Sequence, residues 1–389
     1  MRFLHTSDWH LGRKAQGRDF LAESANVLAE VTRVAKDERV DVVLIAGDTF
    51  DSFAPGSDGY ALFYDTLAAI VGDGAKVVMI AGNHDDASQL DALGGIMRKL
   101  GVHFVGAVPD LATQSLISVP SRDGSETAAI AALPWVQERY ALRFETLLEG
   151  IDKSRAQYRQ VMEALVPRCF GHFPADTVNI FLGHILIDGS EIGEGGGERK
   201  IHIGQAFAVN ASCIPDTAAY VALGHVHKRQ QIAAGSPTQY CGSLLQLDFG
   251  EAEQKKYVNI IEASARAPAD VRAIEVTGGR GLRTVRCTVE ALSSHAGRYG
   301  DDYLRVIVSS DAPVPSLLEQ VRDVLPNALK IELERTDEPA AIETTTYRGL
   351  TPGELLGRYY QTRNNAEIPE PMLRLFGELC EAEAAHAPA

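Results

Sequence analysis

The sequence has few cysteines and no pattern among them. There are five, an odd number, and no two stand at C-x-x-C spacing. A scattered, odd set argues against both a disulfide framework and a cysteine zinc site. The cysteine usage is therefore typical of a protein kept in the reducing cytosol.

Long apolar runs and an excess of basic residues are also missing. No run approaches the roughly eighteen residues of a membrane span, and Asp8 comes too early for a signal peptide. We therefore expect a soluble, unexported protein. The net charge of -15 argues against a simple nucleic-acid binder, because phosphate contacts are made by clustered Lys and Arg.

What is present is ordinary globular material with a regular alternation. The 389 residues are 45% hydrophobic and 23% charged, which is enough for two or three domains. Strand-like runs at 40–47 (VDVVLIAG) and 75–82 (AKVVMIAG) alternate with helix-like stretches at 60–71 and 88–100. This alternation predicts an α/β fold.

Polar residues follow the ends of the predicted strands. The opening strand leads into SDWHLG, and later apolar runs lead into GDTFD, GNHD, GH and GHVH, each beginning with a Gly. In open α/β sheets, sites form beyond the carboxyl ends of strands, and Gly permits a close approach of the backbone. We expect these segments to meet in one cleft although they span more than 200 residues.

The side chains in these segments are typical of a two-metal site. Carboxylate, amide and imidazole without thiolate suit Mn, Fe or Zn. Seven such ligands are too many for one ion, and Asp48 has two oxygens with which to bridge two ions. The sequence leaves open which His of HVH serves which ion. The candidate ligands are Asp8, His10, Asp48, Asn83, His184, His225 and His227.

Such a site predicts hydrolysis of phosphoesters. Two ions about 3.5–4 Å apart bind a nucleophilic water and phosphoryl oxygens and stabilise an in-line displacement. His84, next to Asn83, is predicted to protonate the leaving oxygen or to stabilise charge on the phosphate. We expect Asp85 to orient His84 by a hydrogen bond.

Each motif has an ordinary interpretation when taken alone. D-x-H arises by chance, GD after a strand is usually a turn, and a single His is usually structural. The order of the five motifs, four of them directly after an apolar run, favours the metal site.

The motifs in this order resemble the calcineurin-like metallophosphoesterase superfamily. SDWHLG, AGDTFD, AGNHD and YVALGHVHKRQ are similar, more narrowly, to the SbcD family of bacterial DNA-repair nuclease subunits. The resemblance covers residues 1–270 closely. It implies a metallophosphoesterase β-sandwich flanked by helices, a small α+β capping domain and C-terminal helices.

Carried over by position, the resemblance assigns the ligands. It implies two Mn²⁺, with Mg²⁺, Fe²⁺ or Zn²⁺ as alternatives, and His84 acting on the phosphate. Many archaeal and eukaryotic relatives have a His where this chain has Asp51, so a second imidazole is not expected there. Asp51 either supports the site or is a structural loop acid. One manganese would be held by Asp8, His10, Asp48 and His227, and the other by Asp48, Asn83, His184 and His225.

The rest of the chain predicts two further domains. Stretches rich in Ala, Gly and Arg (ASARAPAD, TGGRGLR) indicate a boundary. The resemblance implies a nuclease domain over 1–275, a capping domain that orients DNA over 276–345, and C-terminal helices over 346–389. The capping region shows a strand at 303–308, a helix at 315–325 and a strand at 329–334. A small domain with no ligand contact fits this stretch as well.

The tail contains two helix candidates, at 351–362 and 369–385. Apolar residues recur at helical spacing in the second. This face either packs on its own domain or, as the resemblance implies, docks on the coiled coil of an SbcC-like ATPase. An ATPase that grips the duplex would reconcile the acidic charge with a DNA substrate. The face consists of Met372, Leu375, Phe376, Leu379 and Cys380.

The resemblance implies a metal-dependent DNA nuclease subunit acting in repair, recombination and replication. The implied activities are double-strand 3′–5′ exonuclease and single-strand or hairpin endonuclease. The implied state is a homodimer, or a heterotetramer with the ATPase, in the cytoplasm with the nucleoid. Two other hypotheses remain. One is a small-nucleotide metallophosphodiesterase that would not need the C-terminal hundred residues. The other is a non-catalytic scaffold for the ATPase, which the intact ligand set disfavours.

Overall fold

The computed structural model describes most of the chain. It covers residues 1–15, 17–108, 116–137, 158–171, 173–192, 208–265, 267–335, 352–364 and 367–377. Two compact units, Met1–Glu334 and Arg335–Ala389, are distinguished by their internal contacts.

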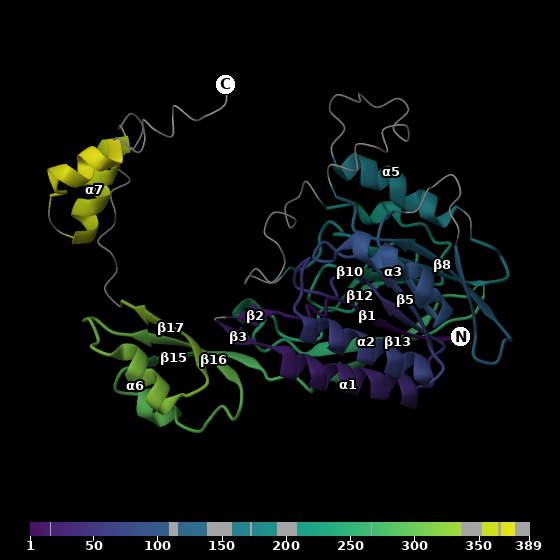
Figure 1. The fold of residues 1–389 in the computed structure, drawn as a ribbon, viewed down its shortest axis with the longest axis horizontal. Helices are drawn as coiled ribbons and strands as arrows, with labels where there is room; N and C mark the ends of the chain where they lie inside the picture. The colour runs from purple at the N-terminus through teal and green to yellow at the C-terminus, as the bar shows by residue number, and fades with distance from the viewer. Residues whose placement is uncertain are drawn as a thin grey trace. The chain divides into compact units, whose positions relative to one another are not determined.

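The first unit is built on two six-stranded sheets (Figure 1). Each contains a run of four parallel strands with antiparallel pairings beyond it. In spatial order, the first sheet contains β14 (Asp270–Val276), β13 (Lys256–Glu262), β1 (Arg2–Thr6), β4 (Val42–Ile45), β5 (Lys76–Ile80) and β6 (Val102–Val105). The second contains β11 (Gln230–Ile232), β12 (Thr238–Tyr240), β10 (Tyr220–Gly224), β9 (Val178–His184), β8 (Thr127–Leu133) and β7 (Ile117–Pro120).

The two sheets pack face to face as a β-sandwich. Leu44 and Ile80 of the first sheet share a buried cluster with Ile130 and Leu182 of the second. Helices cover the outer faces, so the parallel strands are buried on both sides. This burial explains their unbroken apolar runs, such as VVLI in β4. The expected α/β sandwich flanked by helices is confirmed.

Helices cover each outer face of the sandwich (Figure 1). Residues Val27, Leu28 and Val31 of the first helix point into the core of the first sheet, as an amphipathic period requires. Val161 and Leu165 of the helix at 158–170 pack on the second sheet. The helices are α1 (Leu21–Asp37), α2 (Ser57–Gly72) and α3 (Ala87–Lys99) on the first sheet, and α5 (Tyr158–Phe170) on the second.

A smaller part of the first compact unit, residues 282–334, follows the sandwich, and we call it the small unit. Its sheet is wholly parallel, and the helix α6 (Leu317–Val324) packs on it through Val321. Tyr303 joins it to α1, because its ring stacks on Phe20 and its hydroxyl donates to Glu23 at 2.5 Å. The strand-helix-strand prediction is confirmed, but the first strand of this sheet was not foreseen. The strands are β15 (Leu282–Thr288), β16 (Tyr303–Ser309) and β17 (Ala328–Glu334).

Shorter elements connect these parts. A two-stranded hairpin follows β1, and three 3₁₀ turns lie in loops of the described part of the chain. They are β2 (Lys14–Ala15), β3 (Arg18–Asp19), η3 (Ala211–Cys213), η4 (Phe249–Glu251) and η5 (Leu292–His295).

The second compact unit is helical where it is described. It contains α7 (Pro352–Asn364) and a further helical segment at 370–377. Met372 and Leu375 are 46% and 56% exposed there. Residues 378–385 of the predicted tail helix, with Leu379 and Cys380, lie outside the described residues. None of the described helices is both long and apolar enough to cross a membrane.

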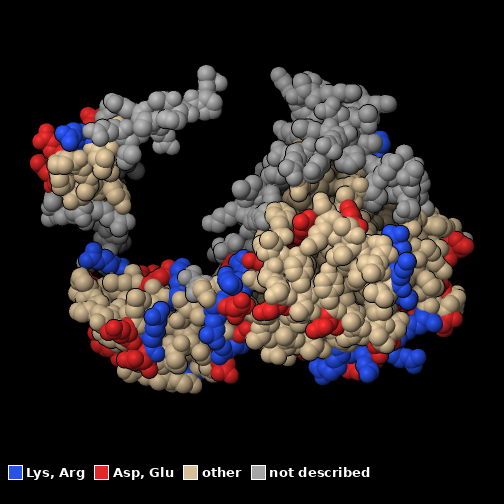
Figure 2. All heavy atoms as spheres, viewed as in Figure 1, with Lys and Arg blue, Asp and Glu red and all other residues tan. Residues whose placement is uncertain are grey.

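The described surface mixes charges of both signs. Figure 2 shows Lys and Arg side chains lying among Asp and Glu over the small unit and along the sandwich. Three ion pairs on the small sheet illustrate this: Arg286–Glu334, Arg305–Glu332 and Arg283–Asp302. The face in view therefore offers alternating charges and not a broad basic surface.

Candidate metal centre

The structure brings all seven predicted ligands to one edge of the sandwich. They lie at the carboxyl ends of parallel strands from both sheets, and each is buried. The convergence follows from topology, because parallel strands place their carboxyl ends at the same edge. Asp8 follows β1, Asp48 follows β4, Asn83 follows β5, His184 ends β9, and His225 and His227 follow β10.

The backbone at this edge is unusual. Asp8, His10, Asp48 and His225 all have positive φ, between 47° and 98°. For residues other than Gly this conformation costs on the order of 1–3 kcal/mol each and persists only where the surroundings enforce it. The strand-end turns thus aim four of the seven side chains inward at a cost in backbone energy.

Two glycines allow the strand ends to meet. A Cβ on Gly82 would lie 2.1 Å from Asp48 Oδ1, and one on Gly47 would lie 2.4 Å from His184 Nδ1. Gly47 also has a φ of +87°. Gly47 and Gly82 are therefore required by close approach, as the sequence predicts.

The donor atoms form two groups. We define the first group as Asp8, His10 and His227, and the second as Asp48, His184, His225 and Asn83. In the first, the donor atoms all lie within 4.8 Å of one another, as do those of Asp48, His184 and His225 in the second. Asn83 Oδ1 lies 3.1 Å from His184 Nε2 and 3.0 Å from His225 Nδ1.

Asp48 connects the two groups through a single oxygen. Its Oδ2 lies 3.8 Å from His10 Nε2 and 3.5 Å from His184 Nε2. Its Oδ1 instead accepts a hydrogen bond from the backbone N–H of His84 at 2.8 Å. Oδ2 is therefore the oxygen that faces both groups, and bridging of two ions through both oxygens stays a prediction.

Electrostatics at this edge favour positive charge. Burial alone would raise the pKa of Asp48, but the adjacent imidazoles of His184, His84 and His10 hold it well below its usual value. Burial lowers the pKa of His184, yet the Asp48 carboxylate raises it to about 9. A metal ligand must be deprotonated, so a cation binding here would compete with that proton.

The donor set fits divalent metal ions. His10 Nε2 is buried and has no hydrogen-bond partner among the described residues. A buried imidazole nitrogen left without a partner is costly unless something else binds it. Carboxylate, carboxamide and imidazole donors together are suited to Mn, Fe or Zn.

His84 lies beside the first group. Its ring is edge-on to that of His10, with centroids 4.8 Å apart, and it is 6% exposed. Its Nδ1 lies 2.8 Å from the carbonyl oxygen of Asp51. A carbonyl only accepts, so Nδ1 carries the proton and the lone pair of the neutral ring is on Nε2.

Asp85 does not orient His84 by the expected hydrogen bond. Its carboxylate accepts from the backbone N–H groups of Thr49, Phe50 and Gly82 at 3.3, 3.0 and 2.8 Å. Burial and the charge of Asp48 raise its pKa to about 6. Asp85 therefore joins the loops after β4 and β5.

Asp51 is in contact with the site. Its Oδ1 lies 3.2 Å from His10 Nδ1 and 3.2 Å from Arg13 Nη1. Burial acts to raise its pKa, but the hydrogen bond from His10 and the charges of His10 and Arg13 lower it overall. Of the two interpretations of Asp51, the contact with His10 fits a supporting acid.

Two residues at this edge were missed in the sequence. Trp135 stacks on His225 with centroids 5.1 Å apart, and it follows β8, so the strand-end rule would have found it. Glu251 Oε1 lies 2.8 Å from His227 Nδ1 and is almost fully buried. Glu251 follows Gly250 and the apolar-rich stretch LLQLDF at 244–249, but that stretch forms no strand and Glu251 ends a short 3₁₀ turn, so the strand-end rule does not mark it.

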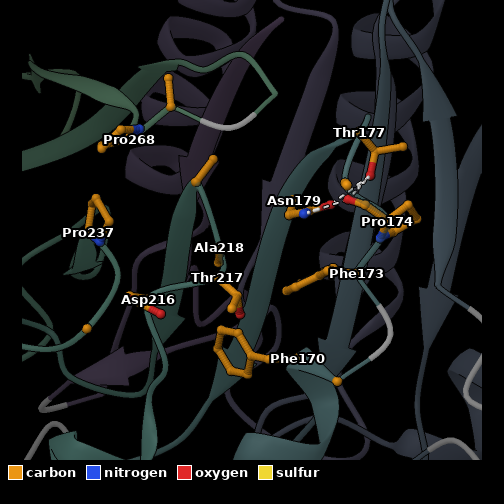
Figure 3. Close-up of a pocket in the computed structure, with 15 residues that line it drawn as sticks. Phe170, Phe173, Pro174, Thr177, Asn179, Asp216, Thr217, Ala218, Pro237 and Pro268 are labelled. Atoms are coloured by element: carbon orange, nitrogen blue, oxygen red, sulfur yellow. Dashed lines mark hydrogen bonds between the residues drawn. The ribbon is translucent and has the colours of Figure 1, made fainter.

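A separate cavity lies at the opposite edge of the second sheet. It has a volume of about 650 Å³ and is lined by residues that precede or begin β9, β10 and β12 (Figure 3). Phe170, Phe173 and Pro174 form part of its wall, and none of the predicted site residues lines it. The candidate metal ligands and the cavity therefore lie at opposite ends of the strands of the second sheet.

Known proteins are similar to this chain along most of its length. Residues 1–229, which contain every predicted site residue, match the family model described as calcineurin-like phosphoesterase. Residues 279–364 match a model described as type 5 capsule protein repressor C-terminal domain. The SbcD subunit of the nuclease SbcCD from Bacillus subtilis is 36% identical over 290 residues, covering 72% of this chain and 71% of that protein.

Two further relatives are the same subunit from other bacteria. That of Escherichia coli K12 is 28% identical over 357 residues, covering 90% of this chain and 85% of its own. That of Rhodobacter capsulatus is 29% identical over 386 residues, covering 91% and 93%. The similarity thus extends through both compact units.

Proposed function

We propose that this chain cuts DNA using two divalent metal ions. The premise is that it belongs to the calcineurin-like phosphoesterase family and, within that family, to the SbcD nuclease subunits. Membership makes it a phosphodiester hydrolase and a nuclease subunit. We further propose how many metal ions it binds, which residues hold each ion and which DNA substrates it cuts.

The first group, with Asp48, would hold one ion, and the second group would hold the other. Asp48 Oδ2 carries this assignment, because it lies between an imidazole nitrogen of each group at 3.8 and 3.5 Å. Mn²⁺ suits the mixed oxygen and nitrogen donors. Bound ions would supply Lewis-acid stabilisation of the phosphate and a nucleophilic water.

The protein's own groups perform the remaining steps. The carbonyl of Asp51 fixes the ring of His84 through Nδ1, so Nε2 is the atom that would meet the phosphate. When protonated, His84 can donate Nε2–H to the leaving oxygen or stabilise charge on the phosphate. Trp135, stacked on His225, shields the second group from water on that side.

The assembly we propose has three parts. Residues 1–275 form the nuclease domain, 276–345 a capping domain that orients DNA, and 346–389 helices that dock on the coiled coil of an SbcC-like ATPase. The separate core of the small sheet and the exposed Met372 and Leu375 support this division. The active form would be a homodimer within a heterotetramer, in the cytoplasm near the nucleoid.

Digestion of end-labelled duplex and hairpin DNA tests the proposal. The protein, with and without an SbcC-like ATPase, is assayed with Mn²⁺, with Mg²⁺ and with chelator. We expect 3′–5′ shortening of duplex and opening of hairpins with Mn²⁺, and none with chelator. Replacing His84→Ala should lower the rate about 10²- to 10⁴-fold without loss of Mn²⁺ binding.

The control is His103→Ala, a partly buried imidazole in β6 of the sandwich that belongs to neither group. Equal rates for His84→Ala and the unaltered chain would overturn the catalytic role. A chain that turns over small nucleotides without competition from DNA would be a phosphodiesterase of another specificity.

A further inference from the structure

Glu251 has a fixed place behind His227. Its Oε1 lies 2.8 Å from His227 Nδ1, and both side chains are 2% exposed. Its Oε2 lies 2.6 Å from Lys256 Nζ and 3.3 Å from the backbone nitrogen of Leu247. Because donors surround both oxygens, the carboxylate has little freedom to turn.

Lys256 closes this network. Its ammonium is 6% exposed and also donates to the carbonyl oxygen of His227 at 3.2 Å and to Ser243 Oγ at 2.8 Å. An ammonium paired with Glu251 keeps that carboxylate ionised, and an ionised carboxylate can only accept hydrogen bonds. The proton between Glu251 and His227 therefore belongs to Nδ1 of the imidazole.

That proton decides which nitrogen of His227 binds a metal. With Nδ1 protonated, the lone pair is on Nε2, the nitrogen remote from Glu251. A carboxylate behind an imidazole also increases the electron density on the ligating nitrogen and holds the ring in place.

The imidazoles of the two groups differ in this respect. In the first group, the Nδ1 atoms of His10 and His227 face carboxylates, Asp51 at 3.2 Å and Glu251 at 2.8 Å. In the second, Nδ1 of His184 faces the neutral carbonyl of Ala46 at 2.7 Å. Glu251 is the shorter and more buried of the two carboxylate contacts.

We propose that Glu251 is a positioning residue for the metal ion of the first group, acting through the Nδ1 proton of His227. The inference rests on the proposed metal site. Loss of the carboxylate would weaken one of the two ions and leave the other in place. Outer-shell partners of this kind are typically worth about 10- to 100-fold in metal affinity.

The test is a Mn²⁺ titration followed by electron paramagnetic resonance of free Mn²⁺, using Glu251→Gln and the unaltered chain. We expect two ions per unaltered chain. In Glu251→Gln, one should be weakened about 10- to 100-fold and the second unchanged. Glu253→Gln is the matched control, since Glu253 is an exposed acid two residues along the same loop.

A second measurement follows the proton itself. In metal-free protein with ¹⁵N-labelled histidine, the His227 signal, assigned with His227→Gln, should report Nδ1–H in the unaltered chain. It should report a mixed or reversed tautomer in Glu251→Gln. Glu251→Asp keeps the charge beside Lys256 but shortens the reach to Nδ1, and should lose affinity to an intermediate degree.

The outcomes separate the two proposals. An unaltered chain that binds no Mn²⁺ would overturn the proposed metal site, whatever Glu251 does. An unaltered chain that binds two ions, with the same affinities and tautomer in Glu251→Gln, would overturn the role of Glu251. If Glu251→Gln does not fold, Glu251→Asp decides: affinities equal to those of the unaltered chain would also overturn it.

Discussion

The strands of the second sheet carry polar, buried side chains at their carboxyl ends and an open, largely apolar cavity at their amino ends. At the carboxyl ends of β9 and β10 lie the buried imidazoles of His184, His225 and His227, beside acids that follow strands of the first sheet. At the amino ends lies an open cavity walled by Phe170, Phe173 and prolines (Figure 3). The comparison shows that the strands are a support, and that the turns at each end determine what that end can bind.

The two edges differ because of the geometry of the turns at the strand ends and not because of the composition of the strands. Both ends extend from the same apolar runs, such as YVALG in β10. Only the carboxyl edge combines positive φ at acids and histidines with glycines at contact distance from them. Three predictions follow from this contrast, in order of expected effect.

The largest effect is expected from removing charge at the carboxyl edge. Asp48→Asn should lower Mn²⁺-dependent DNA cleavage at least about 10³-fold, because several kcal/mol of metal and transition-state stabilisation depend on that carboxylate. Asp216→Asn, which removes an acid from the cavity wall at the amino edge, should leave the rate unchanged. Equal losses in the two variants would break the contrast between the edges.

A smaller effect is expected from crowding the turn. In Gly82→Ala, the new Cβ would lie 2.1 Å from Asp48 Oδ1 and 2.3 Å from the Asp48 backbone nitrogen, so the turn that carries Asp48 must move. A displacement on the order of 1 Å near reacting groups costs about 10²-fold in rate. The Cβ of Gly171→Ala at the amino edge would meet, among the described residues, the Arg168 carbonyl oxygen at 3.5 Å, and this variant should be tolerated. Steady-state cleavage rates and Mn²⁺ affinities of both variants check this.

The smallest effect concerns the interior that both edges share. His5 in β1 is fully buried, with its ring nitrogens 3.0 Å from the Tyr220 hydroxyl and 3.2 Å from the Leu223 carbonyl. Burial lowers its pKa to about 3, whereas an unfolded His titrates near 6.5. His5 therefore stabilises the fold fully above about pH 6.5, and this contribution is lost as the pH falls towards 3.

Urea unfolding of chelator-treated protein at pH 7.5 and pH 5 measures this loss. The unaltered chain should lose about 2 kcal/mol more than His5→Gln over that range. An equal pH dependence of the unfolding free energy in the two chains would mean that His5 is protonated in the folded protein at pH 5. The interior would then accept a charge, as the carboxyl edge does.

The sequence predicts those parts of the site that depend on neighbouring residues along the chain. Apolar runs followed by Gly and a polar residue identify the strand ends, and parallel topology then brings Asp8, Asp48 and His184 together. These are consequences of chain direction and side-chain chemistry, both of which can be read from neighbouring residues. The α/β alternation and the strand-helix-strand order of the small unit follow from the same periodicities, whereas the sandwich was implied by the family resemblance.

What escaped prediction depends on contacts between distant segments. Which oxygen of Asp48 faces the imidazoles is decided by the N–H of His84, which belongs to another loop. Asp85 serves three backbone amides and not the adjacent histidine, because the turn points its carboxylate at the neighbouring loop. Glu251 has an ordinary local sequence, and only burial beside Lys256 and His227 reveals it.

The spread of the site along the chain, from Asp8 to Glu251, also governs timing. A ribosome releases Asp8, Asp48 and Asn83 long before it adds His225 and His227, and domains begin to fold from the amino terminus during synthesis. Until the last strands of the second sheet have been translated, the nascent polypeptide lacks the imidazoles that complete the cluster. Under the proposed two-metal mechanism, a half-made molecule would therefore not cut the nucleic acid beside which it is being produced.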